Sequence, residues 1–288
     1  MRTSHHIPFI SVFVLVFFLL SPLLGAAEGQ KSDGAAKTPP PGAIVQLTDV
    51  QKTIFDKFHL KNVRPGQTLT YRFERKGLLG DDYKDEVHLM VTSGRTEQAR
   101  TVGFRFFSGN RRRPYPELSD VTSNPLLTLY FNKDVWDLAR RIKARGVANY
   151  LRNRILDSLA QASNMQDAVC VLPAGADGAA GSQEVTGKRV VISPYRKDEN
   201  RHHLVHYSSM QYEIIVSDDV PGGVCEISTV VPFPSEKTPE HFLLTLKKSR
   251  MLSLAAEVEK VNKLKTTKVP LIVERLQFLK VSDTINRE

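Results

Sequence analysis

The stretch LTYRFER, residues 69–75, decides the fold class, because apolar and polar residues alternate along it. This alternation places Leu69, Tyr71 and Phe73 on one face of a β-strand. Two further strands are predicted after short turns, at 87–92 and 101–107. Short strands at this spacing indicate an antiparallel meander with one buried and one solvated face.

A helical segment follows the meander and supplies the apolar surface that its buried face needs. Asn124-Pro125 is a typical helix opening, a capping residue followed by proline at the first helical position. We expect two or three helices between Asn124 and Ser163, because Gly146 interrupts the helical spacing. The apolar residues at this spacing are Phe131, Val135, Leu138, Ile142, Ala148, Leu151, Ile155, Leu159 and Ala162.

The second half of the chain returns to strands. They are predicted at 189–193, 205–216, 223–231, 242–247 and 271–281, with a surface loop at 174–182 and a hairpin connection at 218–223. Residues 252–264 fit either a strand or a helix. Before the meander, Thr48 and Gln51 form a capping-box pattern that opens a helix ending before Pro65. The sequence therefore predicts an α+β fold, in which a curved, mainly antiparallel sheet of half-barrel-like meanders is covered by an inserted helical pair.

The amino terminus resembles an export signal. Arg2 precedes the apolar run 9–20, which Pro22 breaks before small residues at 25–27. The alternative is an uncleaved anchor, because residues 7–27 are about long enough to span a bilayer. We expect a signal peptide at 1–27 and a periplasmic or secreted protein with no transmembrane span after cleavage. A flexible linker at 28–42, a single domain at 43–281 and a tail at 282–288 then complete the chain.

Composition excludes several classes of protein. With 41% hydrophobic and 25% charged residues over 288 positions, the chain has enough apolar residues for a core but is too polar for a multispanning membrane protein. Two cysteines exclude a disulfide-dense scaffold and a cysteine-built zinc module. In an oxidising compartment Cys170 and Cys225 either form one disulfide or stay as two buried thiols, and the sequence leaves both alternatives open.

Positive charge is concentrated in one window. Residues 105–154 hold eleven Lys and Arg against four Asp and Glu, which is most of the net charge of +9. Arginine is the residue expected where a carboxylate or phosphate is gripped by two hydrogen bonds. We predict that an anion or an acidic partner binds here, through Arg111, Arg112, Arg113, Arg141, Arg145, Arg152 and Arg154. The alternative is a solvated face on which Asp137 pairs with Arg141 at helical spacing.

Motifs for catalysis and metal binding are absent from the sequence. It contains no nucleophile elbow, no zinc-protease helix and no complete phosphate-binding loop. The nearest metal candidates are His202 and His206, which lie about 13 Å apart on a strand, too far for one zinc ion. We expect no metal and no cofactor. Nucleic acid is not an expected partner, because export removes it and no basic-aromatic alternation occurs.

Two segments resemble a family of uncharacterised exported proteobacterial proteins. They are residues 54–63 followed by 69–73, and residues 124–127 with Asp134 followed by 150–155. The family has no assigned activity, so the resemblance carries no catalytic residues. The order of elements is also loosely similar to that of curved-sheet periplasmic carriers of the LolA/LolB type, although the basic helical insert departs from a plain carrier.

Three functional hypotheses follow. The first is a non-catalytic binding or carrier protein for a lipid or other amphiphile, with an apolar groove lined by Leu69, Tyr71, Phe73, Phe104 and Phe106. The second is an envelope assembly protein that docks on an acidic polymer or protein through its arginine-rich helices. The third is a hydrolase with a dispersed active site. No positive feature of the sequence supports the hydrolase, so we favour a protein that is not an enzyme.

Overall fold

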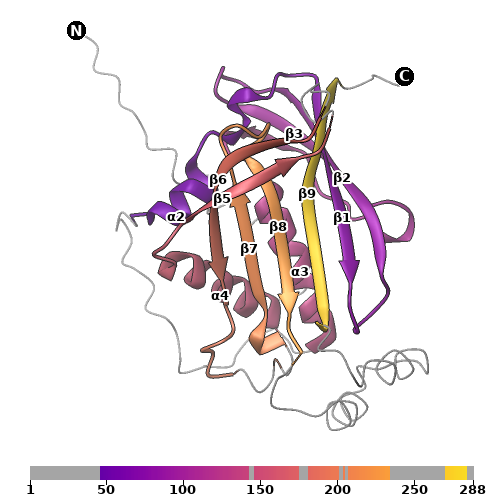
Figure 1. The fold of residues 1–288 in the computed structure, drawn as a ribbon, viewed down its shortest axis with the longest axis vertical. Helices are drawn as coiled ribbons and strands as arrows, with labels where there is room; N and C mark the ends of the chain where they lie inside the picture. The colour runs from indigo at the N-terminus through magenta and orange to yellow at the C-terminus, as the bar shows by residue number, and fades with distance from the viewer. Residues whose placement is uncertain are drawn as a thin grey trace, which may run out of the picture. The chain divides into compact units, whose positions relative to one another are not determined.

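The computed structural model describes residues 46–142, 146–174, 181–200, 204, 207–233 and 270–283. The predicted signal peptide and linker, and the predictions for 242–247 and 252–264, lie outside these residues. Within the described part, nine antiparallel strands form one open sheet in the order β4-β3-β2-β1-β9-β8-β7-β6-β5 (Figure 1). The predicted α+β fold with a curved antiparallel sheet is therefore confirmed.

The strands of the first half include the predicted meander. They are β1 (Gln67–Lys76), β2 (Tyr83–Ser93), β3 (Arg100–Phe106) and β4 (Leu118–Val121). The second half contributes β5 (Gln166–Leu172), β6 (Gln183–Ile192), β7 (Gln211–Val216), β8 (Val224–Val231) and β9 (Ile272–Asp283). The last strand does not extend an edge of the sheet. Because β9 pairs with both β1 and β8, it joins the two halves.

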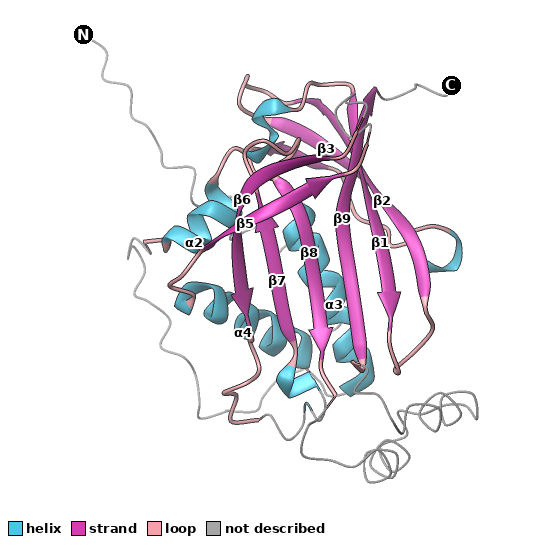
Figure 2. Ribbon diagram, in the orientation of Figure 1, coloured by secondary structure: helices cyan, strands magenta, loops and turns pink. Residues whose placement is uncertain are grey.

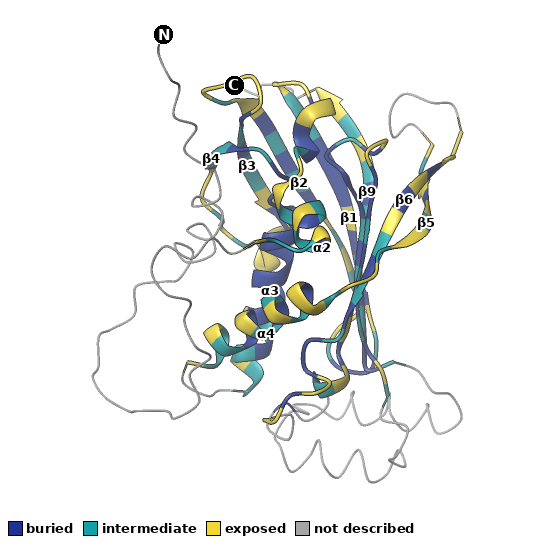
Figure 3. Ribbon diagram, turned by 90° about the vertical axis from the view of Figure 1, so that its left-hand side faces the viewer, coloured by how far each residue is buried: buried dark blue, intermediate teal, exposed yellow. Residues whose placement is uncertain are grey.

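Two helices cover one face of the sheet, as predicted. They are α3 (Leu126–Ile142) and α4 (Val147–Gln161), and both lie on the same side of β1 and β9 (Figures 2 and 3). Asn124 caps α3, because its Oδ1 accepts a hydrogen bond of 3.0 Å from the Leu126 N–H. Gly146 separates the helices and has φ +74°, a conformation that glycine adopts readily. Among the described helices, none is both long and apolar enough to cross a membrane.

The amino-terminal helix is shorter than predicted. The capping box of Thr48 and Gln51 is present at the start of α2 (Asp49–Gln51), and the chain continues as one π-helical turn, η1 (Lys52–Asp56). Lys57 then adopts an extended backbone, and a separate 3-10 turn, η2 (His59–Asn62), follows. The interruption at Lys57 ends the helical spacing that the sequence pattern continued to Phe58.

Several strand predictions needed correction. The strand predicted at 189–193 begins already at Gln183, as β6. The strand predicted at 205–216 begins only at Gln211, because Tyr207–Ser209 form a 3-10 turn, η4, that is closed by a hydrogen bond from the Met210 N–H to the Tyr207 carbonyl. Strand β4 was not predicted. It is a four-residue edge strand with one buried residue, so it shows too little alternation to be recognised.

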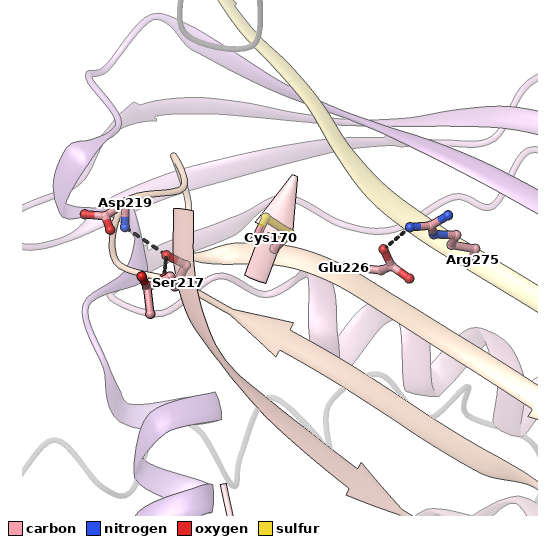
Figure 4. The surroundings of a disulfide bond; sticks show 7 residues. Cys170, Ser217, Asp219, Glu226 and Arg275 are labelled. Carbon is pink, nitrogen blue, oxygen red and sulfur yellow. Dashed lines mark hydrogen bonds and ion pairs between the residues drawn. A yellow bond between two sulfur atoms is a disulfide. The ribbon is translucent and has the colours of Figure 1, made fainter. Parts of the chain in front are cut away.

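A disulfide joins Cys170 of β5 to Cys225 of β8 (Figure 4). Two strands, β6 and β7, lie between these strands in the sheet. In a flat sheet three strand spacings amount to about 14 Å, whereas the two Cα atoms are 6.2 Å apart. The sheet must therefore coil strongly at this end, and β5 crosses β8 there (Figure 1). Of the two alternatives for the cysteines, the structure has the disulfide.

Candidate anion-binding site

Six arginines line one cleft with a volume of about 470 Å³, which we call the arginine cleft. They are Arg75, Arg111, Arg112, Arg113, Arg140 and Arg141, and among the described residues only two acidic ones, Asp81 and Asp137, line the cleft with them. One wall is η3 (Gly109–Arg111) with the residues after it, and the other is the last turn of α3. The connection between β1 and β2 supplies the floor. Four of the seven predicted arginines thus meet in one place, and Arg75 and Arg140 were not predicted.

Asp137 holds two of these arginines. Its Oδ1 accepts hydrogen bonds from Arg113 Nη2 at 2.5 Å and from Arg140 Nη2 at 3.0 Å. The pairing of Asp137 with Arg141 that the sequence allowed does not occur, since the aspartate carboxylate turns to Arg113 and Arg140 instead. Arg111 lies over the ring of Tyr83, with its guanidinium carbon 4.3 Å from the ring centre. Three of the six guanidinium groups are therefore fixed by partners inside the cleft.

The side chains of Arg112 and Arg141 have no hydrogen-bond or ion-pair partner in the described part of the chain. The Arg141 side chain is half-buried, and it converges with Arg75 on Gly80. A Cβ atom placed on Gly80 would lie 3.3 Å from Arg75 Nη2 and 3.9 Å from Arg141 Nη2. Two positively charged guanidinium groups thus approach the same point above Gly80, which has no side chain to fill it. An anion placed there would be attracted by both.

A buried charge cluster lies directly beneath the arginine cleft. Arg75 pairs with Glu274 of β9, Glu274 pairs with Lys133 of α3, and Lys133 Nζ lies 2.5 Å from Asp134 Oδ1. The side chains of Lys133, Asp134 and Glu274 are 1%, 5% and 3% exposed. Thr229 donates to Asp134 Oδ2 at 3.1 Å. We call Arg75, Lys133, Asp134 and Glu274 the buried charge cluster.

The two carboxyl groups of the buried charge cluster differ in the cations that they contact. Glu274 contacts both Arg75 and Lys133, whereas Asp134 contacts Lys133 alone. Burial raises the pKa of Asp134 to about 7, an effect that Lys133 opposes and Glu274 reinforces. Burial also acts to raise the pKa of Glu274, but the attraction of Lys133 and Arg75 outweighs it and lowers the pKa. Asp134 is therefore the carboxyl of the pair that takes up a proton first.

A small cavity of about 30 Å³ separates the buried charge cluster from the arginine cleft. Arg75, Asp137 and Arg141 line both spaces, and Asp134 and Glu274 line only the inner one. Tyr207 also lines this inner cavity, and its buried hydroxyl has no hydrogen-bond partner among the described residues. The volume suits one water molecule, which needs two to four polar partners. Leu138, Met210, Val231 and Ile272 make much of its lining apolar, and Arg75, Asp137 and Arg141 connect it to the cleft.

The remaining predicted arginines do not join the cleft. Arg152 is buried on α4, where Nε donates to Asn132 Oδ1 at 3.3 Å and Nη1 to Asn149 Oδ1 at 2.8 Å. Arg154 lies in another pocket, 3.1 Å from Asp198 Oδ2 and with its guanidinium over the ring of Tyr150. Arg145 lies outside the described residues, as do the metal candidates His202 and His206. Among the residues that the structure describes, no group of three or more His, Cys, Asp or Glu is placed to hold a metal ion.

The residues expected to line an apolar groove belong mainly to the core. Leu69, Tyr71, Phe73 and Phe106 are fully buried, while Phe104 is half-buried. Asn124 donates to the Tyr71 hydroxyl, and Lys133 of α3 lies over the Phe73 ring. The covering helix therefore occupies the face of the sheet where an amphiphile would have to bind. Neither the arginine cleft nor the inner cavity includes any of these five side chains among its described lining residues.

Sequence reasoning missed the buried charge cluster, although the sequence carries a signal for it. Arg75 continues the inward alternation of Leu69, Tyr71 and Phe73, and Glu274 alternates with the buried Ile272 and Leu276. A charged residue at a position reserved for the buried face must be paired or bound. Arg75 occupies such a position in residues 69–75, so the sequence pattern predicts that its side chain is paired.

We compared the chain with protein-family models, curated proteins and solved structures, and none of the three comparisons gave a match. The resemblance to an exported family therefore stays an expectation.

Proposed function

We propose that this protein is a non-catalytic binding protein of the cell envelope that holds an anionic group of its ligand in the arginine cleft. The observation that carries the proposal is the unpaired state of Arg112 and Arg141 in a described cleft where arginines outnumber aspartates six to two. Unpaired guanidinium groups in a concave site have the geometry and the charge that oxyanions require. Export of the chain, expected from its first 27 residues, places the ligand in the envelope.

The cleft favours a polar anionic group over an acyl chain. Its lining is dominated by arginine and aspartate, and its two aromatic residues are already engaged, because Tyr83 lies beneath Arg111 and Phe107 is buried against Phe73. The core beneath α3 is filled by the side chains once expected to line a groove. We therefore propose that a ligand of this protein is recognised by its charged group and that any apolar part stays outside the core.

Titration calorimetry with sulfate tests this proposal. The double variant Arg112→Gln/Arg141→Gln removes the two unpaired guanidinium groups and should weaken sulfate binding by tenfold or more. The matched control is Arg64→Gln/Arg72→Gln, which removes the same charge from two exposed residues that do not line the cleft. Equal loss in both double variants would mean that only net charge matters, and no binding by the wild type would contradict the proposal.

A further inference from the structure

The arginine cleft and the buried charge cluster share Arg75, so a charge bound in one must affect the other. Arg75 Nη1 pairs with Glu274, while Nη2 donates to the Leu79 carbonyl at 3.0 Å and lies near Gly80 on the floor of the cleft. The contacts continue without a break through Lys133 to Asp134. An anion that binds at Arg75 and Arg141 is therefore separated from Asp134 by three side chains, Arg75, Glu274 and Lys133, which direct ion pairs connect.

The charge balance of the buried charge cluster connects anion binding to the protonation of Asp134. With all four groups ionised, the two cations and two carboxylates of the buried charge cluster cancel. A bound anion adds negative charge at Arg75 and cancels part of the positive field that favours ionised Asp134. Protonation of Asp134 leaves the buried charge cluster with one net positive charge, which compensates negative charge on the bound anion.

We propose that the arginine cleft binds its anion together with one proton, and that the carboxyl of Asp134 is the site of that proton. The inference rests on the proposed anion-binding function and adds a second ligand to it. The inner cavity provides the route, because Asp134, Arg141 and Tyr207 all line it. Coupling between two binding sites is reciprocal, so the anion raises proton affinity and the proton raises anion affinity by the same factor.

The titratable and charged groups around Asp134 come from every element packed against it. Those that face it from the surrounding elements are Lys133, Tyr130 and Asp137 of α3, Glu274 of β9, Arg75 of β1, Tyr212 of β7, Tyr195 after β6 and Tyr115 after β3, with Arg141 and Tyr207 across the inner cavity. Burial raises the pKa of Tyr130, Tyr195 and Tyr212. Burial would lower the pKa of Lys133, but Asp134 and Glu274 raise it well above its ordinary value. Burial raises the pKa of Asp134 itself to about 7.

The sign of the effect follows from linkage. Because the anion raises the pKa of Asp134 above its value of about 7 in the free protein, binding takes up protons and strengthens as the pH falls. Affinity levels off below pH 7, where Asp134 is protonated in both states. A rise of one in this pKa corresponds to about tenfold tighter binding at low pH than at high pH.

Sulfate is the probe, because its charge stays constant between pH 6 and 9. We expect calorimetry to give at least about fivefold tighter binding at pH 6 than at pH 9, and a pH electrode in weakly buffered solution to record uptake of a fraction of one proton per sulfate near pH 7.5. Sulfate binding without proton uptake would overturn this inference and leave the proposed function intact. Absence of sulfate binding at every pH would overturn both.

Two variants locate the proton. Asp134→Asn should bind sulfate with little pH dependence and no proton uptake, whereas the control Asp157→Asn, an exposed carboxyl on α4, should behave as wild type. Thr229→Val removes the hydrogen bond that Asp134 accepts, so the pH profile should move to higher pH without losing its amplitude. Proton uptake that persists unchanged in Asp134→Asn would show that another group takes the proton and would overturn the assignment.

Discussion

Lys133 is the residue whose replacement tests the buried charge cluster most severely. Its ammonium group is shared by Asp134 and Glu274, and its side chain is 1% exposed. In Lys133→Met the shape of the side chain is nearly kept while both ion pairs are lost. Glu274 then keeps Arg75 as its partner, whereas Asp134 loses the cation that it contacts and keeps the hydrogen bond from Thr229.

The expected cost is about 3 kcal/mol at pH 7.5. Breaking one side of a buried ion pair costs about 3–5 kcal/mol, because it leaves a buried charge without compensation. We expect the low end of this range, since the pKa of Asp134 is already raised by burial to about 7 and the carboxyl escapes the penalty by binding a proton. The carboxyl of the variant has a folded-state pKa above its unfolded value, so the destabilisation should be smaller at pH 5.5 than at pH 8.

Urea unfolding followed by circular dichroism measures the effect. The double variant Lys133→Met/Asp134→Asn removes the stranded carboxylate as well and should recover part of the lost free energy of unfolding. A loss below about 1 kcal/mol in the single variant would refute the reasoning. A double variant less stable than the single one would refute it as well.

Four further predictions concern the cleft, the disulfide, the helix cap and the pH dependence of stability. Asp137→Asn releases the two arginines that share its carboxylate, so sulfate should bind about fivefold more tightly in calorimetry, and weaker binding would show that Asp137 orients them for the ligand. Cys170→Ala/Cys225→Ala should lower the free energy of unfolding by about 4 kcal/mol for a separation of 55 residues, and an unchanged urea midpoint would contradict this. Asn124→Ala removes the cap of α3 and two other buried hydrogen bonds, at a cost of about 2–4 kcal/mol in urea unfolding, and a cost under 1 kcal/mol would argue against the cap. Burial raises the pKa of Asp134 to about 7, so stability contributed by its protonated form should fall as the pH rises from 5 to 8, and Asp134→Asn should flatten that fall in thermal unfolding.

The strands and helices were predictable from local sequence patterns. A sheet with one buried face produces alternation of apolar and polar residues, and the helices that cover it produce helical spacing. Strict alternation in residues 69–75 marks β1, and the helical spacing on both sides of Gly146 marks α3 and α4. The insertion of β9 between β1 and β8 was not predictable, since strand order depends on pairing between residues about two hundred positions apart. Nor does local sequence show that the sheet coils enough to bring Cys170 to Cys225.

The candidate site was predictable in part, because some of its arginines are neighbours in the sequence. Arg111, Arg112 and Arg113 lie on one loop, and the prediction that Arg141 approaches them needed only the order of sheet and helix. Arg152 was assigned to the same surface because it continues the run of basic residues. The turn at Gly146 changes the direction of the chain, so α4 directs Arg152 towards Asn132 rather than into the cleft.

A crystal structure with bound selenate tests the central claim most directly, because the anomalous signal of selenium locates the anion without a model of the ligand. We expect a peak in the arginine cleft within hydrogen-bond distance of Arg141 and close to Gly80, where Arg75 converges. The informative crystals are those in which the cleft is open to solvent. Anomalous peaks on other basic surfaces of such crystals, with none in the cleft, would contradict the account.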